Sequence, residues 1–145
     1  MPQATESLLE KALEVALRAH RGQRDKAGQP YILHPLRVMH AVAGEEARAV
    51  ALLHDVVEDT GVTAEDLRRA GFPPTVVEAV EALTKREGEE YADFIERVRL
   101  VPLARQVKLA DLEDNLDARR LPDFSEKDGK RTAKYVRAWH RLKQA

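Results

Sequence analysis

The sequence predicts an all-α fold, as a single bundle of about seven to eight helices over residues 1–145. Apolar residues recur at helical spacing along almost the whole chain, whereas the alternating pattern of strands is scarce. Glycines and prolines separate these periodic segments at intervals of ordinary helix length. A chain of 145 residues also has the size of one typical domain.

The first half of the chain is predicted to form four helices. The first spans about residues 8–20 and ends before a glycine. Pro35 suits the first position of the second helix, because its missing N–H is not needed there, and a glycine at position 44 ends that helix. The third helix is expected over about 45–58. A short fourth helix starts at Thr63, and Asp66, three residues later, completes a capping box.

The second half is predicted to form four more helices. A proline pair at 73–74 opens one, and an apolar stripe places another over about 89–98. Pro102 opens the next, and the last helix runs over about 125–143. Two aromatic residues of that last helix are expected to be core anchors: Tyr135 and Trp139.

The charge balance limits the partners that the protein can bind. There are 24 Lys and Arg residues against 25 Asp and Glu residues, so the global basic excess of a nucleic-acid-binding protein is missing. No stretch approaches the ~20 apolar residues of a membrane helix, and the first residues lack a signal-peptide pattern. We therefore expect a cytoplasmic protein with no nucleic-acid partner and no membrane partner. The oligomeric state stays open.

The chain contains no cysteine. Disulfides, iron–sulfur clusters and thiol nucleophiles are therefore excluded. Any metal ligands must be histidines and carboxylates, which directs attention to the places where these residues gather.

A His-Asp doublet, His54 and Asp55, lies within the apolar periodic run ARAVALLHDVVEDT. Glu58 and Asp59 follow one turn later, so in a continuous helix they would form a second polar layer stacked on the doublet. The same helix buries its leucines and valines, which makes a purely solvated role for these polar groups unfavourable. Acids at the end of a helix also oppose its dipole, and a bound cation would compensate for them.

Two distant side chains could complete the ligands of that cation. If His34, next to the expected helix start, and Asp111, in the run VKLADLEDNL, reach the doublet, two imidazoles and two carboxylates surround a divalent metal. Mixed nitrogen and oxygen ligands favour Mn²⁺, Fe²⁺, Zn²⁺ or Co²⁺ over Ca²⁺. Such an ion lowers the pKa of bound water towards ~7 and offsets charge on a phosphoryl oxygen. The pattern therefore indicates a hydrolase of phosphate esters.

The run around Asp111 also offers two contacts for a substrate. Asn115 lies one helical turn after Asp111, where its amide can hydrogen-bond a substrate or orient a ligand. Lys108 lies three residues before Asp111, on roughly the same side of the helix, and is a plausible phosphate contact.

Three motifs resemble a known family. The strings HRGQRDKAGQPYILHP, LLHDVVEDT and VKLADLEDN, between His20 and Asn115, resemble the HD superfamily. Within it they are similar to the RelA/SpoT-type alarmone hydrolases and their small stand-alone relatives. This resemblance implies an all-helical, Mn²⁺-dependent enzyme that removes pyrophosphate from the 3′ position of guanosine tetra- or pentaphosphate. The partner is then a small phosphorylated nucleotide.

The resemblance also implies a role for each motif residue. Four of these residues would bind the metal: His34, His54, Asp55 and Asp111. Glu58 and Asp59 would be the catalytic pair that handles water and protons. Asn115 would lie by the sugar and phosphate of the nucleotide, and Lys26 would help to hold the base or the phosphates. The synthetase and regulatory domains of the long members are not expected here, because no residues remain to build them.

Four positions depart from the family pattern. Asp25 replaces the first residue of an Arg-Lys pair that the family has in this loop. Three further changes lie on either side of Asn115: Asp114, Asp117 and Ala118. Asp25, Asp114 and Asp117 thus place anions near the nucleotide, where the alarmone hydrolases have cations, which leaves the physiological substrate open. Another phosphorylated nucleotide or metabolite is one alternative, and a metal-dependent nucleotide-binding module without turnover is a second. A helical adaptor that binds no metal is the third.

Overall fold

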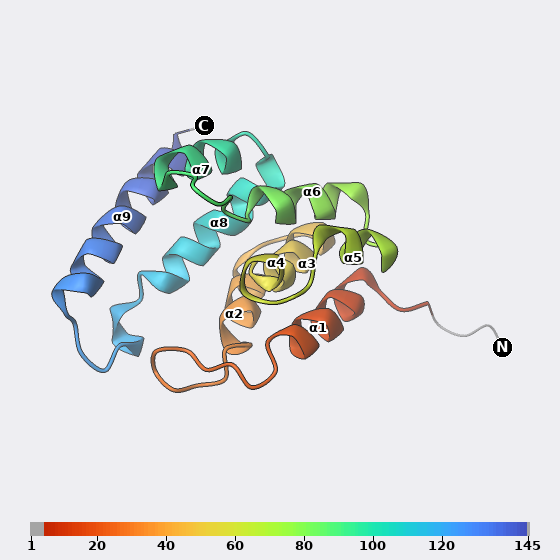
Figure 1. Cartoon of the computed structure of the whole chain (residues 1–145), viewed down its shortest axis with the longest axis horizontal. Coiled ribbons are helices and arrows are strands. Elements are labelled where there is room, and N and C mark those ends of the chain that lie inside the picture. The colour runs from red at the N-terminus through yellow and green to blue at the C-terminus, as the bar shows by residue number, and fades with distance from the viewer. Residues whose placement is uncertain (1–4, 145) are drawn as a thin grey trace.

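A computed structural model describes residues 5–144, and Figure 1 shows that they form helices joined by loops, of which the one over residues 20–32 is long. No strand occurs in this part of the chain, where the one β-bridge pairs Arg24 with Pro30. The predicted all-α fold is confirmed. The elements in chain order are α1 (Leu8–Ala19), α2 (Leu33–Ala41), α3 (Glu45–Leu53), α4 (Val56–Asp59), α5 (Ala64–Arg69), α6 (Pro74–Ala82), α7 (Tyr91–Arg99), α8 (Pro102–Asn115), the 3₁₀ turn η1 (Ala118–Arg120) and α9 (Glu126–Lys143).

Helix α3 lies in the middle of the bundle, between α1 on one side and α8 and α9 on the other (Figure 1). It packs against α1, α2, α6 and α8. Its residues from Ala49 to Leu53 have no exposed surface, as expected for a helix that is covered by neighbours on every side. One apolar cluster joins residues from α1 to α9, so a single core holds these helices together.

The predicted helix starts follow the expected capping chemistry. Thr63 and Ser125 each accept a hydrogen bond from the N–H three residues later, and the acid at that position completes the capping box. Prolines occupy the first turns of α6 and α8. Helix α2 begins at Leu33, two residues before Pro35, so His34 belongs to its first turn and does not precede it. Gly44, with a φ of 97°, makes the turn into α3.

The helix predicted over 45–58 is interrupted at its functional doublet. Helix α3 ends at Leu53, and α4 begins at Val56 after Asp55, whose φ of −102° and ψ of −2° depart from helical values. The expectation of two stacked layers on one continuous helix was therefore wrong. Consecutive residues of a regular helix point about 100° apart. At this break, by contrast, two consecutive side chains turn to the same point.

Helices α2, α3 and α8 pack pairwise against each other and bring three distant segments together. Helices α2 and α8 and the break that follows α3 each supply part of the polar cluster described below. None of the helices over residues 5–144 is long and apolar enough to span a bilayer.

Candidate metal centre

Four side chains from the three packed segments converge on one point. They are the four that the sequence singled out as metal ligands: His34, His54, Asp55 and Asp111. Each offers one nitrogen or oxygen atom, and these atoms lie within 4.8 Å of one another. His34, His54 and Asp111 are buried, and Asp55 is partly exposed. A group of two imidazoles and two carboxylates at this spacing has the composition of a divalent metal site.

Hydrogen bonds fix the orientation of both imidazoles. The Nδ1 atom of His54 donates to the Ala51 carbonyl at 2.5 Å, and Nδ1 of His34 donates to an Asp114 carboxylate oxygen at 2.6 Å. In each ring the Nε2 atom therefore remains to face the cluster. Metal-binding histidines in proteins are held in this way by a second partner.

Asp111 lies at the centre of the cluster. Its Oδ1 atom is 2.9 Å from His34 Nε2 and 3.2 Å from His54 Nε2, while its Oδ2 atom accepts from the Lys108 ammonium at 2.9 Å. The Asn115 amide donates to Oδ1 at 3.1 Å. Lys108 and Asn115, both predicted substrate contacts, thus also hold the carboxylate of a candidate ligand.

The pKa values reflect a concentration of negative charge. Burial alone would lower the pKa of His54, but the carboxylates of Asp55 and Asp111 outweigh it and raise this pKa well above its usual value. Burial would raise the pKa of Asp111, yet the ammonium of Lys108 and the imidazole of His54 hold it well below its usual value. A divalent cation between these atoms would replace the imidazole protons. The residues present therefore fit a divalent metal ion.

The sequence did not indicate the role of Asp114. Its carboxylate accepts a hydrogen bond from His34 at 2.6 Å. It also accepts two hydrogen bonds from the guanidinium of Arg37, at 2.8 and 3.1 Å. Burial would raise the pKa of Asp114, but the hydrogen bonds from His34 and Arg37 lower it to about 2. Asp114 therefore stays ionised and orients His34, and its carboxylate also accepts from Arg120. The signal was available in the spacing, because Asp114 follows Asp111 by three residues on one helix.

Tyr31 is a second residue that the sequence did not single out. Its hydroxyl donates a hydrogen bond to Asp55, and burial together with the Asp55 charge raises its pKa, so the hydroxyl remains a donor. The ring packs between His20 and His34, with centroid distances of 4.9 and 5.7 Å. Tyr31 therefore positions the one candidate ligand that is not fully buried.

A cavity of about 370 Å³ opens onto the four candidate ligands. Glu58 and Asp59, the predicted catalytic pair, lie at its rim, and Lys108 and Asn115 line it as well. Partial burial and the charges of Asp55 and Glu58 raise the pKa of Asp59. Although α3 is interrupted, the short helix α4 thus keeps both acids beside the cluster.

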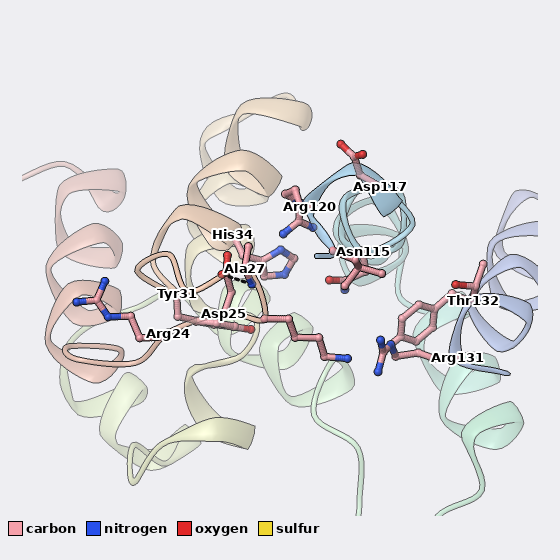
Figure 2. Close-up of a pocket in the computed structure, with 13 residues that line it drawn as sticks. Arg24, Asp25, Ala27, Tyr31, His34, Asn115, Asp117, Arg120, Arg131 and Thr132 are labelled. Atoms are coloured by element: carbon pink, nitrogen blue, oxygen red, sulfur yellow. Dashed lines mark hydrogen bonds between the residues drawn. The ribbon is translucent and has the colours of Figure 1, made fainter. Parts of the chain in front are cut away.

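A second cavity of about 270 Å³ adjoins the first and holds the remaining predicted residue, Lys26. Four residues line both cavities: Tyr31, His34, Asn115 and Tyr135. The two cavities are therefore neighbours, and Figure 2 shows the residues that line the second one. The aromatic ring of Tyr135, expected to serve only as a core anchor, belongs to this site.

Comparison with known proteins gives consistent matches. A family model for the HD domain matches residues 12–121. A guanosine-3′,5′-bis(diphosphate) 3′-pyrophosphohydrolase of Aquifex aeolicus is 34% identical over 158 residues, which cover 97% of this chain and 22% of that protein. A GTP pyrophosphokinase of Streptomyces coelicolor is 37% identical over 150 residues, covering 92% of this chain and 18% of that protein. The chain thus spans about a fifth of the length of these relatives.

A solved structure extends the match to three dimensions. It belongs to a metazoan ortholog of SpoT that is described as hydrolysing ppGpp. The two chains superimpose with a TM-score of 0.80 at 25% identity, covering 99% of this chain and 89% of the other. The similarity therefore extends over nearly the whole helical bundle.

Proposed function

Because this chain belongs to the HD domain family, we propose that it is a metal-dependent phosphohydrolase of a nucleotide polyphosphate. The first candidate substrate is guanosine-3′,5′-bis(diphosphate), from which it would remove the 3′-pyrophosphate. The relatives named for this activity support the proposal. The observation that carries it is the convergence of four nitrogen and oxygen donors from three segments at a cavity that is also lined by two acids, Glu58 and Asp59.

The metal ligands in this proposal are His34, His54, Asp55 and Asp111. Mn²⁺ is the proposed ion, with Fe²⁺, Zn²⁺ or Co²⁺ as alternatives. When bound, the ion supplies an acidified water and a positive charge that neutralises the phosphoryl oxygens. Each ligand has a partner that fixes its position, because Asp114, Ala51, Tyr31 and Lys108 hold one ligand each.

Glu58 and Asp59 would hold the attacking water and accept its proton. A general base works best when its pKa lies near the working pH, and the raised pKa of Asp59 moves it in that direction. Glu58 is held by the main-chain N–H of Lys85, which donates to its carboxylate at 3.3 Å. The two acids therefore have distinct surroundings, and we assign the proton transfer to Asp59 and the positioning of water to Glu58.

The substrate would be oriented by cations and amides that line the metal cavity. Lys108 of α8 and Lys134 of α9 line this cavity together with the two acids on α4. A phosphate bound in the cavity would have its charge balanced by the lysines and would lie close to Glu58 and Asp59. Asn115, at the junction of the two cavities, is placed to hydrogen-bond the sugar.

The experiment is an assay of metal-loaded protein with Mn²⁺ and a panel of phosphate esters. The panel contains guanosine tetraphosphate, other nucleotide 3′- and 5′-phosphates and sugar phosphates. We expect release of pyrophosphate from the guanosine 3′ position. Release from a different member of the panel would replace the substrate and keep the reaction class. Turnover of no member by protein that is shown to contain metal would overturn the catalytic proposal.

A further inference from the structure

Tyr91, the first residue of α7, lines the metal cavity and has no role in the proposed function. Helix α7 packs against α8 and α9 (Figure 1). The centre of the Tyr91 ring lies 5.9 Å from that of Phe94 and 6.3 Å from that of Tyr135. Both neighbouring rings line the same cavity, so the three form a continuous aromatic part of its lining.

The hydroxyl of Tyr91 is a buried polar group without a partner. Its oxygen makes no hydrogen bond to any of the described residues. An unsatisfied polar group inside a protein costs free energy, and native structures seldom leave one without a reason. A binding site is such a reason, because the missing acceptor then arrives with the ligand.

Lys134 of α9 is a second donor at the same place. Its ammonium lies 4.4 Å from the centre of the Tyr91 ring and 5.6 Å from that of Tyr135. Two aromatic faces therefore hold this cation in the way that a carboxylate would hold it elsewhere. The ammonium and the hydroxyl thus lie together at the Tyr91 ring, as two donors that an incoming anion could satisfy at once.

The charges that act on the Tyr91 hydroxyl belong to the reacting end of the cavity. Burial raises the pKa of Tyr91 to about 12, against the opposing charge of Lys108. The charges of Asp111 and Glu58 add to this rise, so the hydroxyl is close to a candidate metal ligand and to a predicted catalytic acid. It keeps its proton at neutral pH and is therefore a hydrogen-bond donor and not a base.

We propose that Tyr91 is a further catalytic residue, whose hydroxyl donates a hydrogen bond to a phosphoryl oxygen of the group that is hydrolysed, beside the Lys134 ammonium. The inference rests on the proposed function, because it concerns the group that reacts in the metal cavity. Charge spreads over the phosphoryl oxygens as the phosphorus–oxygen bond breaks, and donors that are already in place stabilise this charge. Tyr91 transfers no proton in this role.

The test compares the wild type with Tyr91→Phe, which removes the hydroxyl and keeps the ring under Lys134. Kinetics are measured on the substrate that the phosphate-ester panel identifies, and inorganic phosphate is titrated calorimetrically into the Mn²⁺-loaded proteins. We expect kcat to fall roughly tenfold and phosphate to bind roughly tenfold more weakly, as for the loss of one hydrogen bond to a charged group. Mn²⁺ affinity should not change. The melting temperature should not fall, because the hydroxyl has no hydrogen bond within the described residues to lose.

The matched control removes a hydroxyl away from the site. Thr75→Val acts at an exposed position of α6, where the hydroxyl donates to Glu46 at 2.9 Å and lines neither cavity. It should leave kcat and phosphate affinity unchanged. A second variant, Tyr91→Leu, also removes the ring that supports Lys134, and it should weaken phosphate binding more than Tyr91→Phe does.

The outcomes separate this inference from the proposed function. A wild type that turns over its substrate, with Tyr91→Phe equal to it in kcat and phosphate affinity, overturns the inference and leaves the proposed function intact. A wild type that hydrolyses nothing overturns the proposed function, and the phosphate titration then decides by itself whether Tyr91 contacts phosphate. A lower melting temperature of Tyr91→Phe with unchanged phosphate affinity would assign the hydroxyl to the core and also overturn the inference.

Discussion

His34 and Asp114 are joined by a hydrogen bond of 2.6 Å between Nδ1 and a carboxylate oxygen, although 80 residues separate them in the chain. This contact fixes which nitrogen of His34 faces the cluster. It also links the cluster to the second cavity, because Arg120 donates to the same carboxylate. The two parts of the site therefore share one anion.

Replacing Asp114 tests this contact. We expect Asp114→Asn to weaken Mn²⁺ binding roughly 10- to 100-fold, because the variant keeps a hydrogen-bond acceptor but loses the charge that holds His34. Competition with a metal indicator dye gives the dissociation constant. Asp93→Asn, at an exposed carboxylate of α7, is the charge-matched control. An unchanged constant in the Asp114 variant would show that His34 needs no such support.

The two acids of α4 should affect turnover and not metal content. We expect Asp59→Asn to lower kcat on the active substrate roughly 10²- to 10⁴-fold, the usual contribution of a general base. Glu58→Gln should also lower kcat, because this acid positions the attacking water. Metal analysis of the purified variants should match the wild type. Glu78→Gln, at an exposed acid of α6, serves as the control. Loss of metal together with activity would instead make the acids ligands.

The Tyr31→Phe substitution removes a single hydroxyl group and keeps the aromatic ring. The ring keeps its packing between His20 and His34, while Asp55 loses the hydrogen bond that positions it. We expect about a tenfold loss of Mn²⁺ affinity with a nearly unchanged melting temperature. The dye competition and a thermal melt measure the two quantities. A large fall in melting temperature with no loss of affinity would assign Tyr31 to the core.

Acid stability should depend on a pair that closes the loop before α7. Arg97 donates to both carboxylate oxygens of Glu89, at 2.7 and 2.8 Å, and these bonds lower the pKa of Glu89 to about 2 from 4.5. A carboxylate whose pKa is lower in the folded than in the unfolded protein stabilises the fold at pH values above its unfolded pKa. For Glu89 this contribution is lost as the pH falls from about 4.5 towards 2. Urea unfolding should therefore show Glu89→Gln less stable than wild type at pH 6, with a difference that shrinks by pH 3. A difference that is independent of pH would contradict this.

Much of the fold could be predicted from the sequence because local signals determine it. Capping boxes at Thr63 and Ser125 and a proline at position 102 mark helix starts that the structure reproduces. The interruption after Leu53 could not be predicted in this way. The apolar period continues across it, and the polar cluster that the break serves is formed by tertiary contacts with α2 and α8.

The candidate metal ligands could be predicted because their residue types alone indicate a metal site. Two histidines and two aspartates have few structural uses inside a helical core, so His54 and Asp111 could be named in advance. Asp114 was misread as an anion in the substrate pocket, since its orientation towards His34 depends on how α2 meets α8. Arg120 and Arg131 carried no motif, and only the packing of η1 and α9 around a cavity brings them together.

The most direct test of the account is a Mn²⁺ titration of metal-free protein, in which free Mn²⁺ is followed by electron paramagnetic resonance. The wild type should bind one ion per chain. His54→Ala and Asp111→Asn should abolish tight binding, while His40→Ala, at an exposed histidine of α2, should leave it intact. A wild type that binds no Mn²⁺, or the same stoichiometry and affinity in all four proteins, would contradict a metal centre at these residues.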